Sequence, residues 1–394
     1  MNNPTFRAEL LMRHMTVLCK DIGPRPPCSP REKLAAEYVK KELAALGISA
    51  VTEQPFKSQR SIAESAVPLM GLAAGGVLLG ALGGRLGRLI GGAAWIAGAL
   101  GIRDLLGATA HPIQRLVATG DSQNVIATIP PSGEVKRRLF LVGHLDTNQA
   151  LPLFPPTPTY LMRPLNTVSL AGSILGGALM IRSALRRKPR LPKWVWVVGA
   201  SLVPNLFIVN SPAPHIEGAN DNATAVSVLL GVAAALREAP LQHTEVTLLF
   251  TGCEEVGCYG LQAYLKDYAP SKHRSYFLDL EMVGAGNIAY VTKHGVSAFN
   301  DYRPSPIMAA AAGKAAQKHP TLNVCGRDMV IVEEVAPLVR EGYHALCIAG
   351  YNAEGYLPNW HRETDQLDRI EPGTLARAAQ YTWAVMAEID TLND

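Results

Sequence analysis

Hydrophobic residues recur at helical spacing in some segments of the chain, and in others they alternate with polar residues or form short runs. The helical pattern covers residues 5–47, 222–237, 261–268, 306–318 and 371–390. The strand pattern covers residues 49–56, 124–129, 138–143, 246–250, 276–283, 288–292 and 345–349. Strands that alternate with helices predict an α/β fold, here a three-layer sandwich with a mixed, largely parallel central sheet.

Two stretches depart from this alternation because they are apolar almost throughout. Residues 66–106 hold two apolar runs separated by Arg85 and Arg88, and residues 160–209 hold two more, separated by the basic segment 186–190. Each pair of runs predicts a helical hairpin. We therefore expect one α/β domain made of residues 1–65, 108–156 and 211–394, with an apolar hairpin at 66–107 and an apolar, basic hairpin at 157–210.

The two hairpins have features of membrane-inserted helices. Their runs approach the length of roughly 17–25 residues that crosses a bilayer. Tyr160, Trp194 and Trp196 lie near run ends, where interfacial aromatic residues occur. Glycines recur every fourth residue, a spacing that lets helices approach closely in lipid; they are Gly76, Gly80, Gly84, Gly172 and Gly176. A soluble helical cap or the interface of a homo-oligomer is the alternative explanation.

Two signals disagree on the side of the membrane on which the α/β domain lies. A short basic loop between apolar runs is typical of the cytoplasm, which would put the α/β domain outside. In contrast, residues 1–18 show no signal-peptide pattern, and the six cysteines show no regular spacing, which indicates free thiols in a reducing compartment. Cys253 and Cys258 could also form a bridge. We expect a protein of the cell membrane, with a slight preference for an extracytoplasmic α/β domain.

The distribution of charge does not favour nucleic acid, and we expect no such partner. The whole chain carries +4, but the first hairpin carries +2 and the second +7, which leaves −5 on the α/β domain. Charged residues make up only 18% of the chain because the hairpins contain so few. A mildly acidic domain with basic, apolar insertions favours contact with a membrane surface.

Candidate metal ligands follow several of the predicted strands. His144 ends an apolar strand in Gly-His-Leu-Asp, and Asp146 is placed to orient its imidazole. Asp221 precedes an apolar helix in Gly-Ala-Asn-Asp-Asn-Ala-Thr; a helix cap is the simpler role for Asn220 and Asn222. A carboxylate such as Asp221 can bridge two metal ions about 3.5–4 Å apart.

Two adjacent glutamates can take different roles in a metal site. Glu254 and Glu255 end another apolar strand, and neighbours on an extended backbone point in different directions. One can bind metal while the other transfers protons. Glu281 ends a further strand, with Asp279 on the same face as a competing ligand, and His361 follows a Pro-Asn-Trp loop. Together these residues predict a metal-dependent hydrolase.

The order of these motifs resembles the co-catalytic zinc aminopeptidases, metallopeptidase family M28. The motifs are His-Leu-Asp, Gly-Ala-Asn-Asp-Asn-Ala, Glu-Glu-Val-Gly, Leu-Glu-Met-Val-Gly and a late histidine, and the resemblance covers residues 8–65, 120–150 and 211–394. It implies two zinc ions, one held by His144, Asp221 and Glu281 and the other by Asp221, Glu255 and His361. It further implies that Glu254 is the general base and Asp146 the residue that orients His144.

One departure concerns the family's Asp-His pair before the last strand. This chain has Glu333-Glu334 there, with Glu334 in the aspartate's place and no histidine. A second concerns the 157–210 hairpin, which lies between His144 and Asp221 and therefore springs from the rim of the expected site.

The resemblance implies an aminopeptidase that acts on peptides or small amides. Three alternatives remain: an amidohydrolase of N-acyl amino acids or other lipophilic amides, a glutaminyl cyclase-like transferase with one zinc, and a non-catalytic membrane scaffold.

Overall fold

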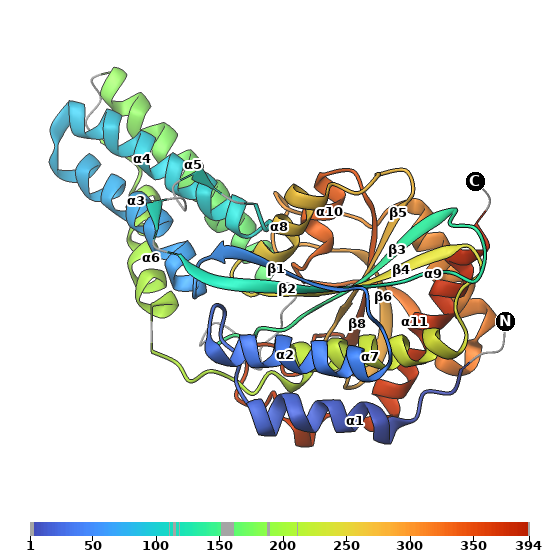
Figure 1. Ribbon diagram of the computed structural model, residues 1–394. Helices are drawn as coiled ribbons and strands as arrows, with labels where there is room; N and C mark the ends of the chain where they lie inside the picture. Colours follow the sequence, from blue (N-terminus) through green and yellow to red (C-terminus); the bar gives the residue numbers. More distant parts are fainter. Residues whose placement is uncertain are drawn as a thin grey trace.

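The centre of the molecule is a mixed β-sheet. The computed structural model describes residues 4–109, 111–112, 116–117, 119–150, 161–186, 190–210 and 212–392. Within this part of the chain the sheet has eight strands in the order β1-β2-β4-β3-β5-β8-β6-β7 (Figure 1). Helices cover both faces, so the predicted α/β sandwich with apolar helical insertions is confirmed.

The four central strands are parallel, whereas antiparallel pairs lie toward the edges. β4, β3, β5 and β8 pair in parallel, and β1–β2, β2–β4 and β6–β8 pair antiparallel. The central strands are almost entirely buried, as expected for parallel strands covered on both faces. The strands are β1 (Val51–Ser58), β2 (Gly120–Ile129), β3 (Arg137–His144), β4 (Thr244–Thr251), β5 (Ser275–Glu281), β6 (Asn287–Lys293), β7 (Cys325–Asp328) and β8 (His344–Tyr351).

Two hydrophobic clusters hold the layers together, one on each face of the sheet. The larger joins the sheet to α1 (Ala8–Thr16), α2 (Pro30–Ala45), α7 (Thr224–Glu238), α9 (Pro306–Lys318) and α11 (Pro372–Asp390). The smaller joins it to α8 (Tyr259–Tyr268) and α10 (Val335–Arg340). Burial of these apolar faces fixes the sheet and, with it, the ends of the strands.

The structure departs from the predicted elements in three places. Residues 5–47 are not one helical segment: α1 continues as a π-helix at Val17–Ile22, and α2 begins only at Pro30. The segment between them contains three prolines, which interrupt helices. The short strand β7 and the short helix α10 were not predicted, because four and six residues are too few to show a period.

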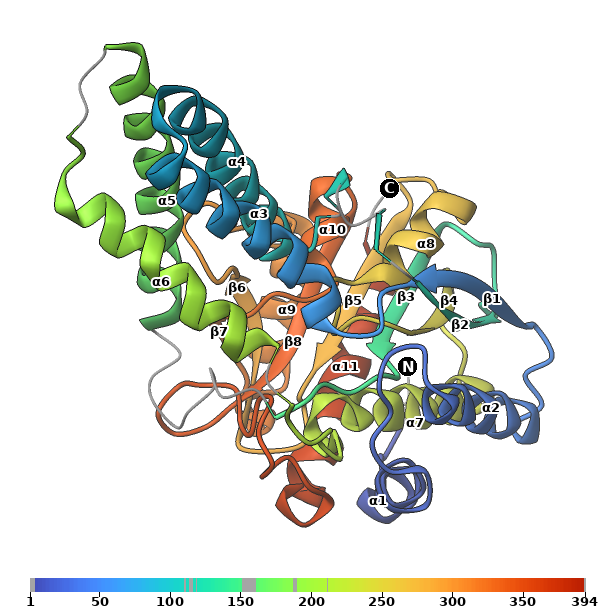
Figure 2. The same ribbon diagram turned by 90° about the vertical axis from the view of Figure 1, so that its left-hand side faces the viewer.

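The two apolar stretches form four long helices that project away from the sheet (Figures 1 and 2). They are α3 (Ile62–Leu82), α4 (Gly84–Leu105), α5 (Met162–Leu185) and α6 (Lys193–Val209), here called the helical insert. Residues 151–160 and 187–189, which include Tyr160 and much of the basic loop, lie outside the described residues. The division into a domain and insertions stays a prediction.

Glycines allow close approach within the helical insert. A Cβ added to Gly76 would lie 2.5 Å from the Gly91 carbonyl oxygen, and one added to Gly92 would lie 2.7 Å from the Gly177 carbonyl oxygen. At these glycines, α3 therefore packs on α4, and α4 on α5, so closely that the helix backbones leave no room for a side chain. The expectation for Gly84 is wrong, because its Cβ would meet nothing within 4 Å and its φ of +60° belongs to a turn.

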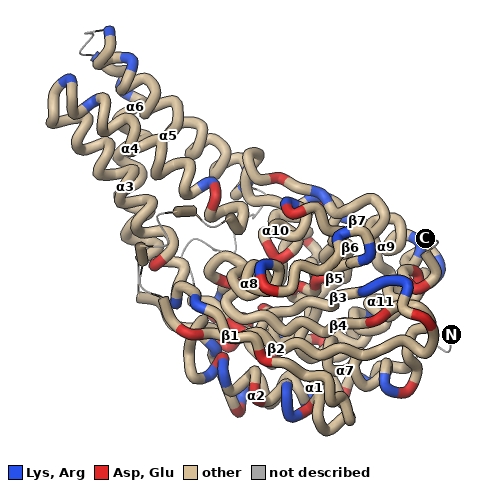
Figure 3. The backbone as a smooth tube through the Cα atoms, turned by 45° about the horizontal axis from the view of Figure 1, so that its top comes forward, with Lys and Arg blue, Asp and Glu red and all other residues tan. Residues whose placement is uncertain are grey.

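The helical insert carries few charged residues along its length, and basic residues gather at its tip (Figure 3). Exposed apolar side chains occur on all four helices; among them are Leu78, Leu82, Leu86, Ile90, Leu165, Val168, Leu175, Val197 and Phe207. The helical segments Ile62–Leu82, Met162–Leu185 and Ala219–Glu238 are long and apolar enough to span a membrane. The last is 89% buried and contains α7, so it belongs to the core.

Candidate metal centre

Five of the residues selected from the sequence meet at the carboxyl edge of the parallel strands. His144 is the last residue of β3, Glu255 follows β4, and Glu281 is the last residue of β5. Asp221 precedes α7, and His361 follows β8. Parallel strands place their carboxyl ends on one side, where α/β sheets bind ligands. All five side chains are buried.

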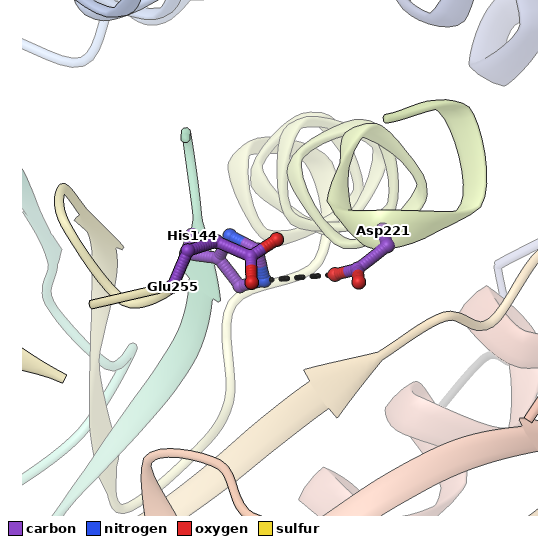
Figure 4. Close-up of side chains that lie close together, drawn as sticks. All are labelled: His144, Asp221 and Glu255. Carbon is purple, nitrogen blue, oxygen red and sulfur yellow. Dashed lines mark ion pairs between the residues drawn. The ribbon is translucent and has the colours of Figure 1, made fainter. Parts of the chain in front are cut away.

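The two carboxylate oxygens of Asp221 face different histidines. Its Oδ1 lies 3.2 Å from His144 Nε2, and its Oδ2 lies 3.3 Å from His361 Nε2. His144 Nε2 is also 3.6 Å from Glu281 Oε2, and His361 Nε2 is 2.9 Å from Glu255 Oε2. Asp221 thus stands between two halves, each with one histidine and one glutamate. Figure 4 shows His144, Asp221 and Glu255 converging on one space.

The cluster holds more carboxylates than its histidines can balance. Burial raises the pKa of Glu281 to about 7 and also raises the pKa of Glu255. Although burial opposes it, the carboxylates of Glu255 and Asp221 raise the pKa of His361 to about 10. Burial likewise raises the pKa of Asp221, but hydrogen bonds from His144 and His361 outweigh it and bring that pKa below its usual range.

These residues fit a pair of zinc ions. Four ligands placed about 2.0–2.1 Å from zinc in a tetrahedron lie about 3.3 Å from one another, close to the separations of 3.2–3.6 Å around His144. Glu255 Oε1 and Glu281 Oε1 are buried and have no hydrogen-bond partner among the described residues. Cations would supply the missing partners and the positive charge that buried carboxylates need.

Asp146 contacts the site differently from the sequence-based expectation. The nearest acceptor to His144 Nδ1 is the backbone carbonyl of Asp146, at 3.0 Å, while its carboxylate Oδ1 lies 3.6 Å away. The carboxylate instead accepts hydrogen bonds from the backbone N–H groups of Glu254 and Glu255, at 3.0 and 3.1 Å. Asp146 therefore fixes the loop that carries both glutamates as well as the orientation of His144.

Glu254 faces the same space but stands apart from the five converging side chains. Its Oε2 lies 4.0 Å from His144 Nε2, and Cys258 donates a thiol hydrogen bond of 3.2 Å to its Oε1. Burial raises the pKa of Glu254 well above its usual range. The cysteines around this loop are free; Cys253 Sγ lies 3.6 Å from Cys28 Sγ rather than bonded to Cys258.

Two asparagines that support the cluster were missed or misjudged from the sequence. Asn148 donates to Glu255 Oε2 at 2.8 Å. Asn222 donates to Glu281 Oε2 at 3.0 Å, and no side chain caps α7, so the helix-cap interpretation of Asn222 is wrong. Asn220 is not a cap either, because its side chain joins Pro358 and Gly284. The polar run around Asp221 was the available signal for Asn222.

Asp279 belongs to a second buried group behind the cluster. Asp279, Glu333 and Cys347 offer ligand atoms within 4.8 Å of one another. Burial raises the pKa of Asp279 well above its usual range and that of Glu334 to about 8, which favours their neutral forms. Glu281 rather than Asp279 lies beside His144. Glu333 instead approaches His294, at 2.8 Å.

A cavity of about 590 Å³ joins the cluster to the helical insert. One end is lined by Asp221, Glu254, Glu255, Glu281 and His361. The rest is lined mainly by apolar side chains, many of them from α3, α4, α5 and α6. The volume lies in the range of small-molecule sites, roughly 300–1,000 Å³.

Similar proteins point to one family. Residues 198–386 match the model of peptidase family M28, a stretch that contains Asp221, Glu254, Glu255, Glu281 and His361. The chain is 26% identical over 183 residues to the probable lipoprotein aminopeptidase LpqL of Mycobacterium tuberculosis. That similarity covers 40% of this chain and only 37% of the relative.

Solved structures share the fold. A zinc aminopeptidase from Bacillus subtilis superposes with a TM-score of 0.59 at 14% identity, covering 99% of this chain and 96% of that one. A glutaminyl cyclase from Bacteroides thetaiotaomicron superposes with a TM-score of 0.58 at 18% identity, covering 98% and 99%. Identities this low establish the fold alone. The family match covers residues 198–386, just under half of the chain, and shows that this part of the chain is similar to peptidase family M28.

Proposed function

We propose that the protein is a zinc-dependent amide hydrolase, in the first instance an aminopeptidase that releases N-terminal residues from short peptides. The observation that carries this proposal is the position of Asp221, whose two oxygens face His144 and His361 at 3.2 and 3.3 Å. A carboxylate shared between two histidine-containing halves suits a pair of metal ions.

In this proposal His144, Asp221 and Glu281 hold one zinc, and Asp221, Glu255 and His361 hold the other. Bound zinc would polarise the amide carbonyl and lower the pKa of water. Asn148 and Asn222 orient the two glutamate ligands through the hydrogen bonds described above. The Asp146 carboxylate holds the backbone of Glu254 and Glu255 in place.

Glu254 is the proposed general base. It lines the cavity, and its Oε2 lies 4.0 Å from His144 Nε2, so it stands beside the cluster rather than within it. A carboxylate in that position can take a proton from the attacking water and pass it to the leaving amine. Burial makes Glu254 a stronger proton acceptor once ionised, since it raises the pKa of that carboxyl.

Paired substitutions test the assignment. Glu254→Gln should lower kcat for amino-acid amides and dipeptides about 10²–10⁴-fold while two zinc ions stay bound, as counted by elemental analysis. His361→Ala should lower both zinc content and activity. Unchanged hydrolysis by Glu254→Gln would refute its role as the base. A zinc content of one in the active wild-type protein would favour a cyclase-like transferase instead.

We further propose that the helical insert lies in a membrane. α3, α4, α5 and α6 have 21, 22, 24 and 17 residues, hence lengths of about 25–36 Å, against about 30 Å for the hydrocarbon core of a bilayer. Their outward apolar side chains would face lipid, and the basic residues at the tip of the helical insert would meet headgroups.

Fractionation tests this location. The full chain should sediment with membranes after a high-salt wash and require detergent for extraction. The double variant Leu78→Glu/Leu82→Glu on exposed positions of α3 should weaken that association, whereas Leu34→Glu, also exposed but on α2, should not. A wild-type protein that stays monomeric in buffer without detergent would overturn the proposal, and a detergent-free dimer would identify the apolar face as a subunit interface.

A further inference from the structure

The catalytic end of the cavity and its apolar end differ sharply in chemistry. At the catalytic end, every carboxylate among the described lining residues is either Glu254 or one of the proposed zinc ligands. A free α-amino group of a peptide would therefore find no carboxylate of its own there. An uncharged acyl group does not need a carboxylate partner.

The apolar end of the cavity is long. The lining residues of α3 run from Ile62 to Ala73, and those of α5 from Met162 to Ser173. At 1.5 Å per residue, each stretch spans about 16 Å along its helix. The exposed side chains Leu165 and Ser169 also line the cavity, so it opens between the helices of the helical insert as well as at the metal centre.

The cavity walls carry few polar groups that could hydrogen-bond to a peptide chain. The lining amides of Asn166 and Asn205 already donate to Val296 O and Ser201 O, at 3.0 and 2.9 Å. An extended peptide would bring one N–H and one C=O per residue into this space and leave most of them without partners. A hydrocarbon chain has no such groups and gains free energy from burial.

We propose that the substrate is an amide with one long acyl chain, of the N-acyl amino acid class, whose chain lies between α3 and α5 while its amide bond lies at the metal centre. This inference rests on the proposed amide hydrolysis and names its substrate. Water adds to the carbonyl carbon, the C–N bond breaks, and Glu254 delivers a proton to the leaving nitrogen. The products are a fatty acid and a free amino acid.

A series of substrates of rising chain length tests this proposal on the full chain in detergent. Acetyl-, hexanoyl- and decanoyl-glycine are compared with glycine amide. The value of kcat/KM should rise about fourfold per added methylene until the chain fills the cavity. Met70→Trp, on the cavity face of α3, should abolish this rise, so that decanoyl-glycine loses far more activity than acetyl-glycine.

Leu78→Trp is the matched control, because Leu78 lies on the same helix but is 60% exposed and does not line the cavity. It should retain the wild-type dependence on chain length, and partition of substrate into micelles is the same for both variants. Equal values for acetyl- and decanoyl-glycine, or equal slowing of both by Met70→Trp, would overturn the inference. Glu254-dependent hydrolysis of glycine amide would leave the proposed function standing in that case. If neither amides nor acyl-glycines are hydrolysed, the proposed function itself fails.

Discussion

The side-chain amide of Asn148 donates a hydrogen bond of 2.8 Å to Glu255 Oε2, the same oxygen that lies 2.9 Å from His361 Nε2. Asn148 is four residues beyond His144, on the loop that leaves β3. The end of β3 therefore contributes a histidine to one half of the cluster, and the loop that follows it restrains a glutamate in the other.

Asn148→Ala should weaken the metal site without emptying it. Loss of a hydrogen bond to a ligand typically costs about 10–100-fold in metal affinity or activity. We expect kcat/KM to fall by that factor and one zinc to exchange faster, as measured by transfer to a chromogenic chelator. Gln149→Ala, at the next position, should behave like the wild type. Equal exchange rates in Asn148→Ala and the wild type would exclude this positioning role.

Removal of metal should lower the thermal stability of the α/β domain. Without cations, the buried carboxylates of Asp221, Glu255 and Glu281 lose their balancing charge, and a ligand that binds only the folded state stabilises it. Differential scanning fluorimetry should show a lower midpoint in the presence of a chelator, restored by zinc.

Two variants distinguish this effect from a nonspecific one. Glu254→Gln should show the same chelator-induced shift, because Glu254 is not a proposed ligand. His361→Ala should show a smaller shift. A midpoint that does not respond to chelator in the wild type would contradict a metal centre built from these carboxylates.

Gly92→Ala should destabilise the helical insert. The added Cβ would lie 2.7 Å from the Gly177 carbonyl oxygen and from Ile181 Cγ1, so α4 and α5 must separate, at a cost of about 1–3 kcal/mol. The unfolding midpoint in detergent should fall accordingly. Gly75→Ala is the control: its Cβ meets nothing within 4 Å, and alanine favours a helix, so its midpoint should hold or rise.

The free energy of unfolding should fall as the pH is lowered from 6.5 to 4, because the pKa of His14 is lower in the folded protein than in the unfolded chain. Burial, followed by the charge of Arg13, lowers the pKa of His14 to about 4, and Nδ1 lies 2.7 Å from the Tyr38 hydroxyl and 3.8 Å from Glu42. The unfolded chain, with a pKa of about 6.5, takes up this proton first as the pH falls. The stability lost by pH 4 is up to about 3 kcal/mol.

His14→Gln removes the titrating group and keeps a hydrogen-bonding side chain beside Tyr38. Urea unfolding of both proteins at pH 7, 6, 5 and 4 should give a flatter profile for the variant. The difference between the two profiles excludes acid effects on the metal centre, which both proteins share. Parallel profiles would show that His14 does not contribute.

The central strands and the long helices were predictable because each carries an unbroken local signal. Residues 139–142 and 246–250 are almost entirely apolar, as burial on both faces requires. The break between α1 and α2 also has a local cause, the prolines after Gly23, but the helical spacing on either side obscured it. β7 is exposed and four residues long, so its sequence holds no comparable pattern.

Hydrogen bonds to the site were less predictable than the side chains that converge there. A candidate ligand is recognisable by its chemistry and its place after a strand, as for His144 and Glu281. The choice between Glu281 and Asp279, two residues apart on one strand, depended on which carboxylate faces His144. The sequence also could not show whether the backbone or the carboxylate oxygen of Asp146 accepts the hydrogen bond from the His144 imidazole. That choice depends on the three-dimensional position of the two oxygens.

The order of motifs along the chain was sufficient to identify the sheet, the convergence of candidate ligands at its carboxyl edge and the apolar character of the insertions. These follow from periodicity and from the rule that parallel strands end on one side. Only the tertiary structure decided that Asp221 stands between two histidines and that the cavity continues from Glu254 into the helical insert. Those relationships join residues separated by up to hundreds of positions, and distances across a packed core depend on every intervening contact.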